Sequence, residues 1–319
     1  MELAIIIISI ISILGSLLPF SKSKHWFVRG QATIRAFYLI LNAVMLILTV
    51  FYLSFSFIKI GLFILLPLSL FVCLRSILPY TLIYPKTIED AKDSDGDNII
   101  VYIHNVYQFN DEYKKEVKTI RKVSPDVILL LETDSEWVNK LEELKNEYSY
   151  EAKEMRDDTY GIIVMSRIAP VELEVKHFVK DSIPSTEMLF NINDKKLRIL
   201  GIHPEPPIPG EKQTSESKDK EIRFSARYIA DLPIEEHKII IGDFNDVAWS
   251  SVSKKFKKVT GMKDVRVGRG FFSTFPTYSP LQIPLDHVFC SPELKIVDFR
   301  TLEDIGSDHL PVSVTFQLP

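Results

Sequence analysis

The chain has 319 residues, enough for two modules, and a net charge of −4 at neutral pH. Its two cysteines, Cys73 and Cys290, exclude a fold that depends on a disulfide framework. Residues 1–84 hold six basic side chains and one acidic one, so the remainder carries an excess of about nine acidic groups. This acidic balance argues against strong non-specific attraction to a polyanion such as nucleic acid.

Three apolar runs open the chain, at 3–20, 36–58 and 60–82. The first two contain no charged residue and the third contains only Arg75, and each has about the length that a helix needs to cross a bilayer core. A cleavable signal peptide fits the first run poorly, since no basic residue precedes it and no small-residue cleavage motif follows. A buried soluble hairpin is the alternative. Three such runs in succession favour an integral membrane anchor over 1–84, in contact with the lipid bilayer.

The charges around these runs bear on topology. The segment 21–35 carries four basic residues, whereas only Glu2 precedes the first helix. The positive-inside rule then puts this segment, and after three crossings the C-terminal part of the chain, in the cytoplasm. Residues 85–98 are acidic and turn-rich, as expected of a linker, and 99–319 reads as one globular α/β domain.

Within that domain, apolar strands run into polar side chains. The run 99–103 leads to Asn105, and the strand ending at Leu131 leads to Glu132. Helices are expected at 111–123 and 136–147, and Tyr160 precedes a further strand. Another strand ends at His203 before prolines, although a single strand-end histidine is more often structural than catalytic.

The stretch KIIIGDFNDVAW, 238–249, is the most informative one. Three consecutive isoleucines predict a strand buried on both faces, and it delivers Asp243 and Asn245 at its end. An ordinary turn is the plain alternative, because Gly, Asp and Asn also punctuate strands. Two Asp-His pairs follow, at Asp286 and at Asp308-His309. This oxygen-rich set has no Cys cluster or HExxH spacing, and it suits Mg²⁺ or Mn²⁺ better than structural zinc.

Seven segments now form an ordered set: HNVYQFN, LLLETDSEW, DTYGIIVMSR, GIHPEPP, GDFNDVAWS, PLDHVF and GSDHLPV. Over 99–319 this set resembles the endonuclease/exonuclease/phosphatase superfamily of DNase I-like phosphodiesterases, sphingomyelinases and inositol phosphatases. The details HPEPP, DTYG and GDFN-x-x-x-W-S are further similar to membrane-anchored bacterial VanJ-like members. The resemblance implies a four-layer α/β sandwich, two mixed sheets packed face to face with helices outside, and an active site at one end.

The resemblance also implies roles for individual residues. Glu132, with Asn105 and Asp308, would hold a divalent cation against a phosphate oxygen. Asp243 would orient and activate the attacking water, and Asn245 would donate to the phosphoryl group. The remaining roles are implied as follows: His309, oriented by Asp286, binds phosphate or transfers a proton; His203 contacts phosphate or protonates the leaving oxygen; Tyr160 contacts substrate or packs.

The sequence therefore predicts a membrane-anchored, metal-dependent phosphohydrolase that cleaves a phosphodiester or phosphomonoester with activated water. The substrate is either a phosphorylated lipid or lipid-linked intermediate, or nucleic acid, and the acidic domain and the anchor favour the lipid. A non-catalytic membrane scaffold on the same fold is the alternative from another class. VanJ-like relatives imply a domain outside a bacterial cytoplasmic membrane, opposite to the charge rule, so both orientations stay open. No protein partner can be inferred.

Overall fold

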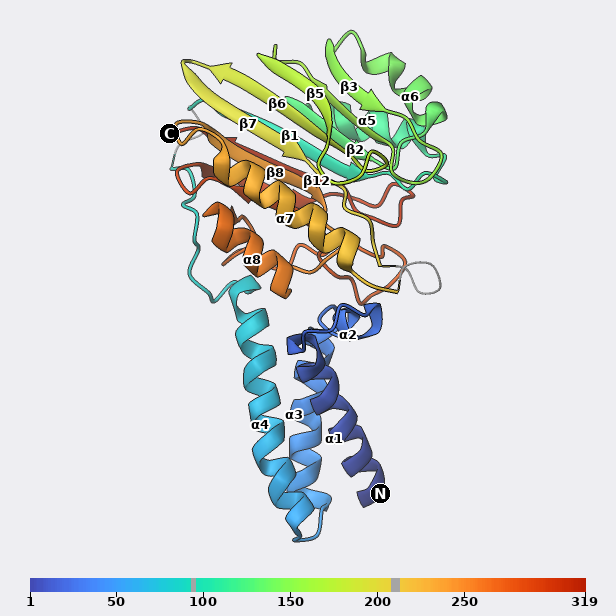
Figure 1. Ribbon diagram of the computed structural model, residues 1–319, viewed down its shortest axis with the longest axis vertical. Coiled ribbons are helices and arrows are strands. Elements are labelled where there is room, and N and C mark those ends of the chain that lie inside the picture. The colour runs from blue at the N-terminus through green and yellow to red at the C-terminus, as the bar shows by residue number, and fades with distance from the viewer. Residues whose placement is uncertain (93–95, 208–212) are drawn as a thin grey trace.

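The computed structural model describes residues 1–92, 96–207 and 213–319, and it has a helical stalk below a β-sandwich (Figure 1). The stalk consists of α1 (Glu2–Leu17), α3 (Arg35–Tyr52) and α4 (Phe57–Ile77). A short helix α2 (Trp26–Gly30) and the 3₁₀ turns η1 (Leu18–Phe20) and η2 (Leu78–Tyr80) lie at its upper end. By length and composition, the helical segments Glu2–Phe20, Arg35–Tyr52 and Phe57–Tyr80 are apolar enough to cross a membrane.

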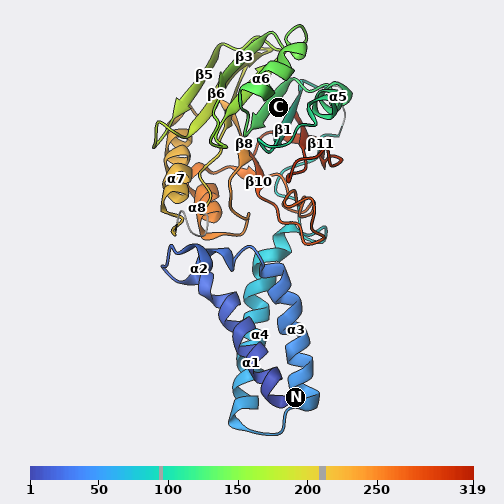
Figure 2. The ribbon, with the colours of Figure 1, turned by 90° about the vertical axis from the view of Figure 1, so that its right-hand side faces the viewer.

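Two six-stranded sheets face one another above the stalk (Figure 2). The first has the order β11-β12-β1-β2-β4-β3 and the second β5-β6-β7-β8-β10-β9. The strands of the first are β1 (Asn98–Asn105), β2 (Val127–Leu131), β3 (Tyr150–Glu154), β4 (Ile162–Ser166), β11 (Lys295–Thr301) and β12 (Val312–Gln317). Those of the second are β5 (Glu172–His177), β6 (Pro184–Ile192), β7 (Lys195–Gly201), β8 (His237–Asp243), β9 (Lys263–Asp264) and β10 (Asp286–Cys290). Both sheets are mixed, since β1–β2 and β7–β8 are parallel pairs among antiparallel ones.

Helices cover the outer face of each sheet. Against the first lie α5 (Tyr113–Val123) and α6 (Ser135–Leu141), and against the second lie α7 (Glu216–Asp231) and α8 (Ser251–Thr260). In α7 the buried Ile222, Ala226 and Ile229 follow helical spacing. The helix expected at 136–147 ends earlier, because its last turn tightens into the 3₁₀ turn η3 (Glu142–Leu144). The four-layer sandwich is confirmed.

Strand alternation determines which side chains reach the site. In β8, Ile239 and Ile241 enter the core between the sheets while Ile240 packs under the helices, so the strand is buried on both faces as predicted. The same period carries Asp243 to the inner side at the end of the strand. In β1 it likewise carries Asn105 inward, after Ile103. Two polar residues from facing sheets therefore meet at one end of the sandwich.

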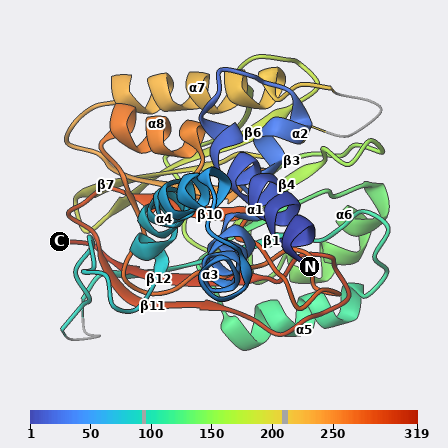
Figure 3. The ribbon, with the colours of Figure 1, turned by 90° about the horizontal axis from the view of Figure 1, so that it is seen from below.

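At that end of the sandwich, the loop after β8 packs against the upper end of the stalk. The stalk helices lie in front of the sandwich when the molecule is seen from below (Figure 3). The indole Nε1 of Trp249 donates to the Ala32 carbonyl at 2.7 Å, and the Tyr80 hydroxyl donates to the Ala248 carbonyl at 3.0 Å. In the predicted linker, Ile88 is buried in the central core, while residues 93–95 lie outside the described part of the chain. The stalk is thus packed against the loop that follows β8.

Candidate active site

Asn105 links carboxylates from both sheets. Its Nδ2 donates to Glu132 Oε1 at 2.8 Å and approaches Asp243 Oδ2 at 3.3 Å. Glu132 follows β2 with a φ of +62°, a left-handed conformation that is uncommon outside glycine. In a regular strand, the side chain of Glu132 would alternate to the face opposite that of Leu131. The left-handed backbone at Glu132 departs from this alternation. The three side chains form the first half of the site.

Close backbone contact brings the end of β7 beside the end of β8. Gly242 has a φ of +139°, and a Cβ at this position would lie 1.9 Å from the Ile202 carbonyl oxygen. Only glycine fits there. The contact sets His203 next to Asp243, with 3.9 Å between His203 Nε2 and Asp243 Oδ2. His203 is buried, and its Nδ1 has no hydrogen-bond partner among the described residues.

A buried carboxylate–histidine pair forms the second half. Asp286 lies directly opposite Asp243 in the β8–β10 pairing, and its Oδ2 is hydrogen-bonded to His309 Nδ1 at 2.8 Å. His309 Nε2 lies 3.5 Å from Asp243 Oδ2. Burial opposes the charge on His309, but Asp286 and Asp243 outweigh it and raise the pKa of this imidazole. Burial would also raise the pKa of Asp286, yet the facing His309 cation lowers it overall. The pair is therefore a protonated imidazole held by an ionised carboxylate.

The two Asp-His sequences differ in the structure. His287 alternates to the opposite face of β10, where it stacks on Phe244 with ring centroids 4.7 Å apart. Burial and the neighbouring Arg266 cation lower the pKa of His287. Its Nε2 lies 2.8 Å from the Asp246 carbonyl oxygen, so His287 supports the loop after β8.

Three buried residues that the sequence analysis did not assign support the site. His104 Nε2 lies 3.2 Å from the His309 carbonyl oxygen, while its Nδ1 contacts Glu116 at 2.7 Å. The Ser307 hydroxyl donates to the Asn105 carbonyl at 2.7 Å and accepts from the His309 amide at 3.0 Å. The available signal was adjacency, since His104 precedes Asn105 and Ser307 belongs to the GSDH segment.

Asn245 and Tyr160 lie at the periphery. The Asn245 amide N–H donates to Asp243 Oδ1 at 2.8 Å and fixes that carboxylate. Its side-chain Nδ2 donates one N–H to the Pro204 carbonyl at 3.0 Å, which leaves the second N–H for the expected phosphoryl contact. The ring of Tyr160 is 5.7 Å from that of His203, centroid to centroid. All nine predicted residues thus lie around this end of the sandwich, Asp308 by its place next to His309.

The donor set fits a hard divalent cation. Burial first, and then the charges of Asp308 and Asp243, raise the pKa of Glu132, although His203 and Asn105 act in the opposite direction. Burial and the charge of Asp243 likewise raise the pKa of the half-buried Asp308. Burial makes it unfavourable for neighbouring carboxylates to be ionised at the same time, and a bound divalent cation would remove this cost. Ligand atoms of Asp243, Asp286 and His309 also lie within 4.8 Å of one another. Because Asp286 and His309 are hydrogen-bonded to each other, we assign them to proton transfer and not to the metal ligands.

Comparisons with known proteins define the class. A model of the Endonuclease/Exonuclease/phosphatase family matches residues 104–309, and the chain belongs to this family, whose members are hydrolases of phosphoester bonds. Humanized D. rerio TDP2 shares the fold with a TM-score of 0.58 at 19% identity, over 69% of this chain and 99% of that one. A family member from Bacteroides vulgatus has a TM-score of 0.57 at 15% identity, over 70% and 99%. No curated protein matches.

Proposed function

We propose that the chain is a membrane-anchored phosphohydrolase that needs a divalent cation and cleaves a phosphodiester or phosphomonoester by attack of water. The observation that supports this most directly is the position of Asp243. Its Oδ2 faces His309 at 3.5 Å on one side and Asn105 at 3.3 Å on the other. A carboxylate fixed between a proton-bearing histidine and a carboxylate–amide pair suits the activation of a water molecule.

The side chains divide the work by chemistry. Asp243 accepts the proton of the attacking water, and the backbone N–H of Asn245 holds the Oδ1 atom of Asp243 in place. His309 donates from Nε2 to a phosphate oxygen or to the leaving oxygen, while Asp286 accepts from Nδ1–H and orients the ring. His203 offers a second contact to the phosphate, and Tyr160 borders the substrate.

Glu132, Asn105 and Asp308 would hold Mg²⁺ or Mn²⁺. When bound, the cation would neutralise charge that develops on the phosphoryl oxygens. The anchor over 1–84, the linker 85–98 and the domain 99–319 belong to the proposal, as does residence of the chain in a membrane, which three apolar helices support.

The preferred substrate is a phosphate ester carried by a lipid. The site end of the sandwich packs against the ends of the apolar helices, and the domain has an acidic excess that repels a polyanion. Nucleic acid is the second candidate, because D. rerio TDP2 complexed with single strand DNA product shares this fold, at 18% identity and a TM-score of 0.58 over 70% of this chain and all of that one.

The test uses the full chain in detergent micelles with a chromogenic phosphomonoester and phosphodiester, with Mg²⁺, Mn²⁺ or excess EDTA. We expect turnover with either cation and none in EDTA, and no turnover by Asp243→Asn. Full activity in EDTA would contradict the cation requirement. A folded protein without turnover, and with no rise of its melting temperature in Mg²⁺, would favour the scaffold.

A further inference from the structure

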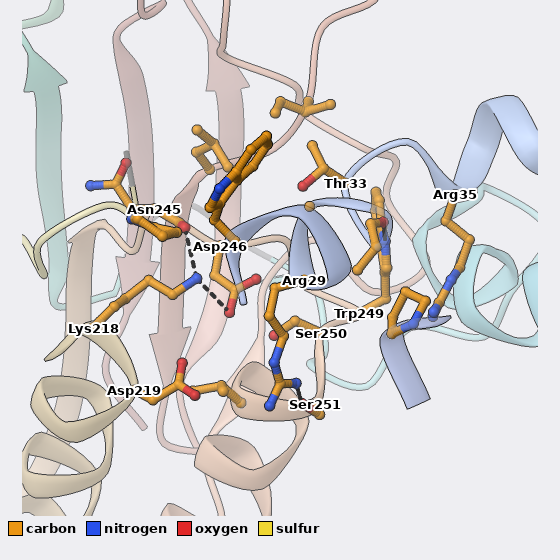
Figure 4. Close-up of a pocket in the computed structure, with 18 of the residues that line it drawn as sticks. Arg29, Thr33, Arg35, Lys218, Asp219, Asn245, Asp246, Trp249, Ser250 and Ser251 are labelled. Carbon is orange, nitrogen blue, oxygen red and sulfur yellow. Dashed lines mark hydrogen bonds and ion pairs between the residues drawn. The ribbon is translucent and has the colours of Figure 1, made fainter. Parts of the chain in front are cut away.

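A cavity of about 280 Å³ lies between the stalk and the sandwich (Figure 4). Its walls come from η1, α2 and the start of α3, from the starts of α7 and α8, and from the loop that follows β8. Asn245 and Asp246 line the cavity, and the Asn245 amide is bonded to the Asp243 carboxylate. The cavity therefore adjoins the proposed active site and shares Asn245 with it.

The lining has four basic and two acidic side chains, and their pairing is uneven. Near the active site the charges balance: Lys218 lies 3.1 Å from Asp246 and donates to the Asn245 carbonyl at 3.0 Å. Burial raises the pKa of Asp219 overall, whereas the charges of Lys218 and, less strongly, of Arg29 stabilise its carboxylate. The remaining two cations are Arg35, at the start of α3 in the stalk, and Lys254, on α8 of the sandwich.

Arg35 is the buried cation that lacks a counter-ion. Only 2% of its surface is exposed, and its described contacts are a hydrogen bond to Ser76 Oγ at 2.9 Å and the ring of Phe20, whose centroid lies 5.0 Å away. Its Nε has no hydrogen-bond partner, and no carboxylate among the described residues pairs with it. A buried guanidinium is costly to leave unpaired, so this arrangement calls for an anion.

Lys254 adds a second charge of the same sign. Desolvation of its ammonium group by the surrounding protein and the positive charges of Arg35, Lys257 and Arg75 lower the pKa of Lys254. Among the described residues, all of the charged neighbours that shift this pKa are basic, so the cations repel one another. An anion between Arg35 and Lys254 would relieve this repulsion.

The rest of the lining is apolar, with Phe20, Trp26, Trp249 and Leu285 among its residues. It lies where the apolar helices end, at the level that the headgroups of a bilayer would occupy around such a stalk. A lipid with an anionic headgroup would use both the cations and the apolar surface. We propose that this cavity binds the anionic, phosphate-bearing headgroup of a membrane lipid and holds it beside Asp243. The inference rests on the proposed function in making that lipid the substrate.

The chain has its own reporter for this site. Of the three tryptophans, Trp26 and Trp249 line the cavity, while Trp137 is buried under the first sheet. The full chain in phosphatidylcholine nanodiscs, with EDTA to prevent turnover, is titrated with dioctanoyl phosphatidate while tryptophan fluorescence is followed. We expect a saturable change with phosphatidate, and none with inorganic phosphate or dioctanoyl phosphatidylcholine at equal concentration.

Variants locate the binding. Because Lys254 is exposed, the Lys254→Ala variant is expected to fold. It should weaken phosphatidate binding about fivefold or more. Arg35→Gln should weaken phosphatidate binding more than Lys254→Ala does. If the Arg35→Gln variant does not fold, Arg29→Gln is measured in its place. Lys255→Ala is the matched control, because Lys255 is the next residue of α8 and lines a different cavity, with Phe256 and Val259.

The outcomes separate the two proposals. An equal response to inorganic phosphate or to phosphatidylcholine, no saturable response, or an equal loss in Lys255→Ala and Lys254→Ala would each overturn the lipid site. Turnover of soluble esters without phosphatidate binding refutes the lipid site and leaves the hydrolase standing. Binding that depends on Lys254, in a protein that hydrolyses nothing, supports the site and refutes the hydrolase.

Discussion

The hydrogen bond between Asp286 and His309 makes the most searching prediction about the catalytic proposal. Both side chains are at least 95% buried, and 2.8 Å separates Asp286 Oδ2 from His309 Nδ1. Asp286→Asn keeps the shape of the side chain but removes the charge that stabilises the imidazolium. We expect the variant to fold and to lose catalytic rate.

The magnitude follows from the kind of bond. A hydrogen bond to a charged group contributes about 1.5–3 kcal/mol, which corresponds to a loss of roughly 10- to 150-fold in kcat. His309→Ala removes the proton donor itself and should cost at least as much. The double variant should then lose little beyond His309→Ala, because Asp286 acts only through the histidine and residues that act as a unit are non-additive.

The assay measures kcat with a chromogenic phosphate ester, and melting temperature, for the four proteins of this cycle. Losses that multiply in the double variant would show that Asp286 does not act through His309. Modest losses of rate with a lowered melting temperature in every variant would instead assign the pair a purely structural role.

Three further predictions concern charge and metal. Wild-type protein with Mg²⁺ at 100 times its Kd should gain about 2.7 kcal/mol of stability, and Glu132→Gln should lose this gain in thermal melts, while full retention would remove Glu132 from the ligand set. Burial and the nearby Glu205 raise the pKa of Glu221 to about 7, although Lys180 acts in the opposite direction, so its ionisation destabilises the fold as pH rises from about 4.5 through 7. The Glu221→Gln variant should therefore have a higher melting temperature than wild type at pH 8 and the same melting temperature at pH 4. An equal difference at both pH values would refute this. Asp264→Ala leaves the fully buried Arg266 without its carboxylate, 2.9 Å away, and should lower the free energy of unfolding in urea by about 3–5 kcal/mol. Asp298→Ala removes an exposed 3.2 Å pair with Arg300 and should lower it by only about 0–1 kcal/mol. Similar losses in the two variants would refute the argument.

The lipid cavity also bears on topology. The charge rule counted Arg29 and Arg35 among the four basic residues of 21–35, and both line the cavity. If they bind a headgroup, their presence has a reason other than orientation, and the charge bias becomes a weaker guide. A reporter fused after Pro319 distinguishes the two orientations directly.

Local patterns in the sequence determined much of this protein. The uninterrupted isoleucines predicted a strand buried on both faces, since burial of successive residues is a property of that segment alone. The apolar runs predicted three long helices because length and composition suffice for this. The order of the polar strand ends indicated the family, and with it the sandwich.

Tertiary structure alone decided how these polar residues meet. Asp286 and His309 are 23 positions apart, and only the packing of the two sheets brings them within 2.8 Å. Strand alternation in β10 sends Asp286 inward and His287 outward, which identical Asp-His sequences cannot reveal. The cavity depends on contacts between 19–35 and 206–285, which no local pattern encodes, because side chains so far apart in the chain become neighbours only through the packing of the stalk on the domain.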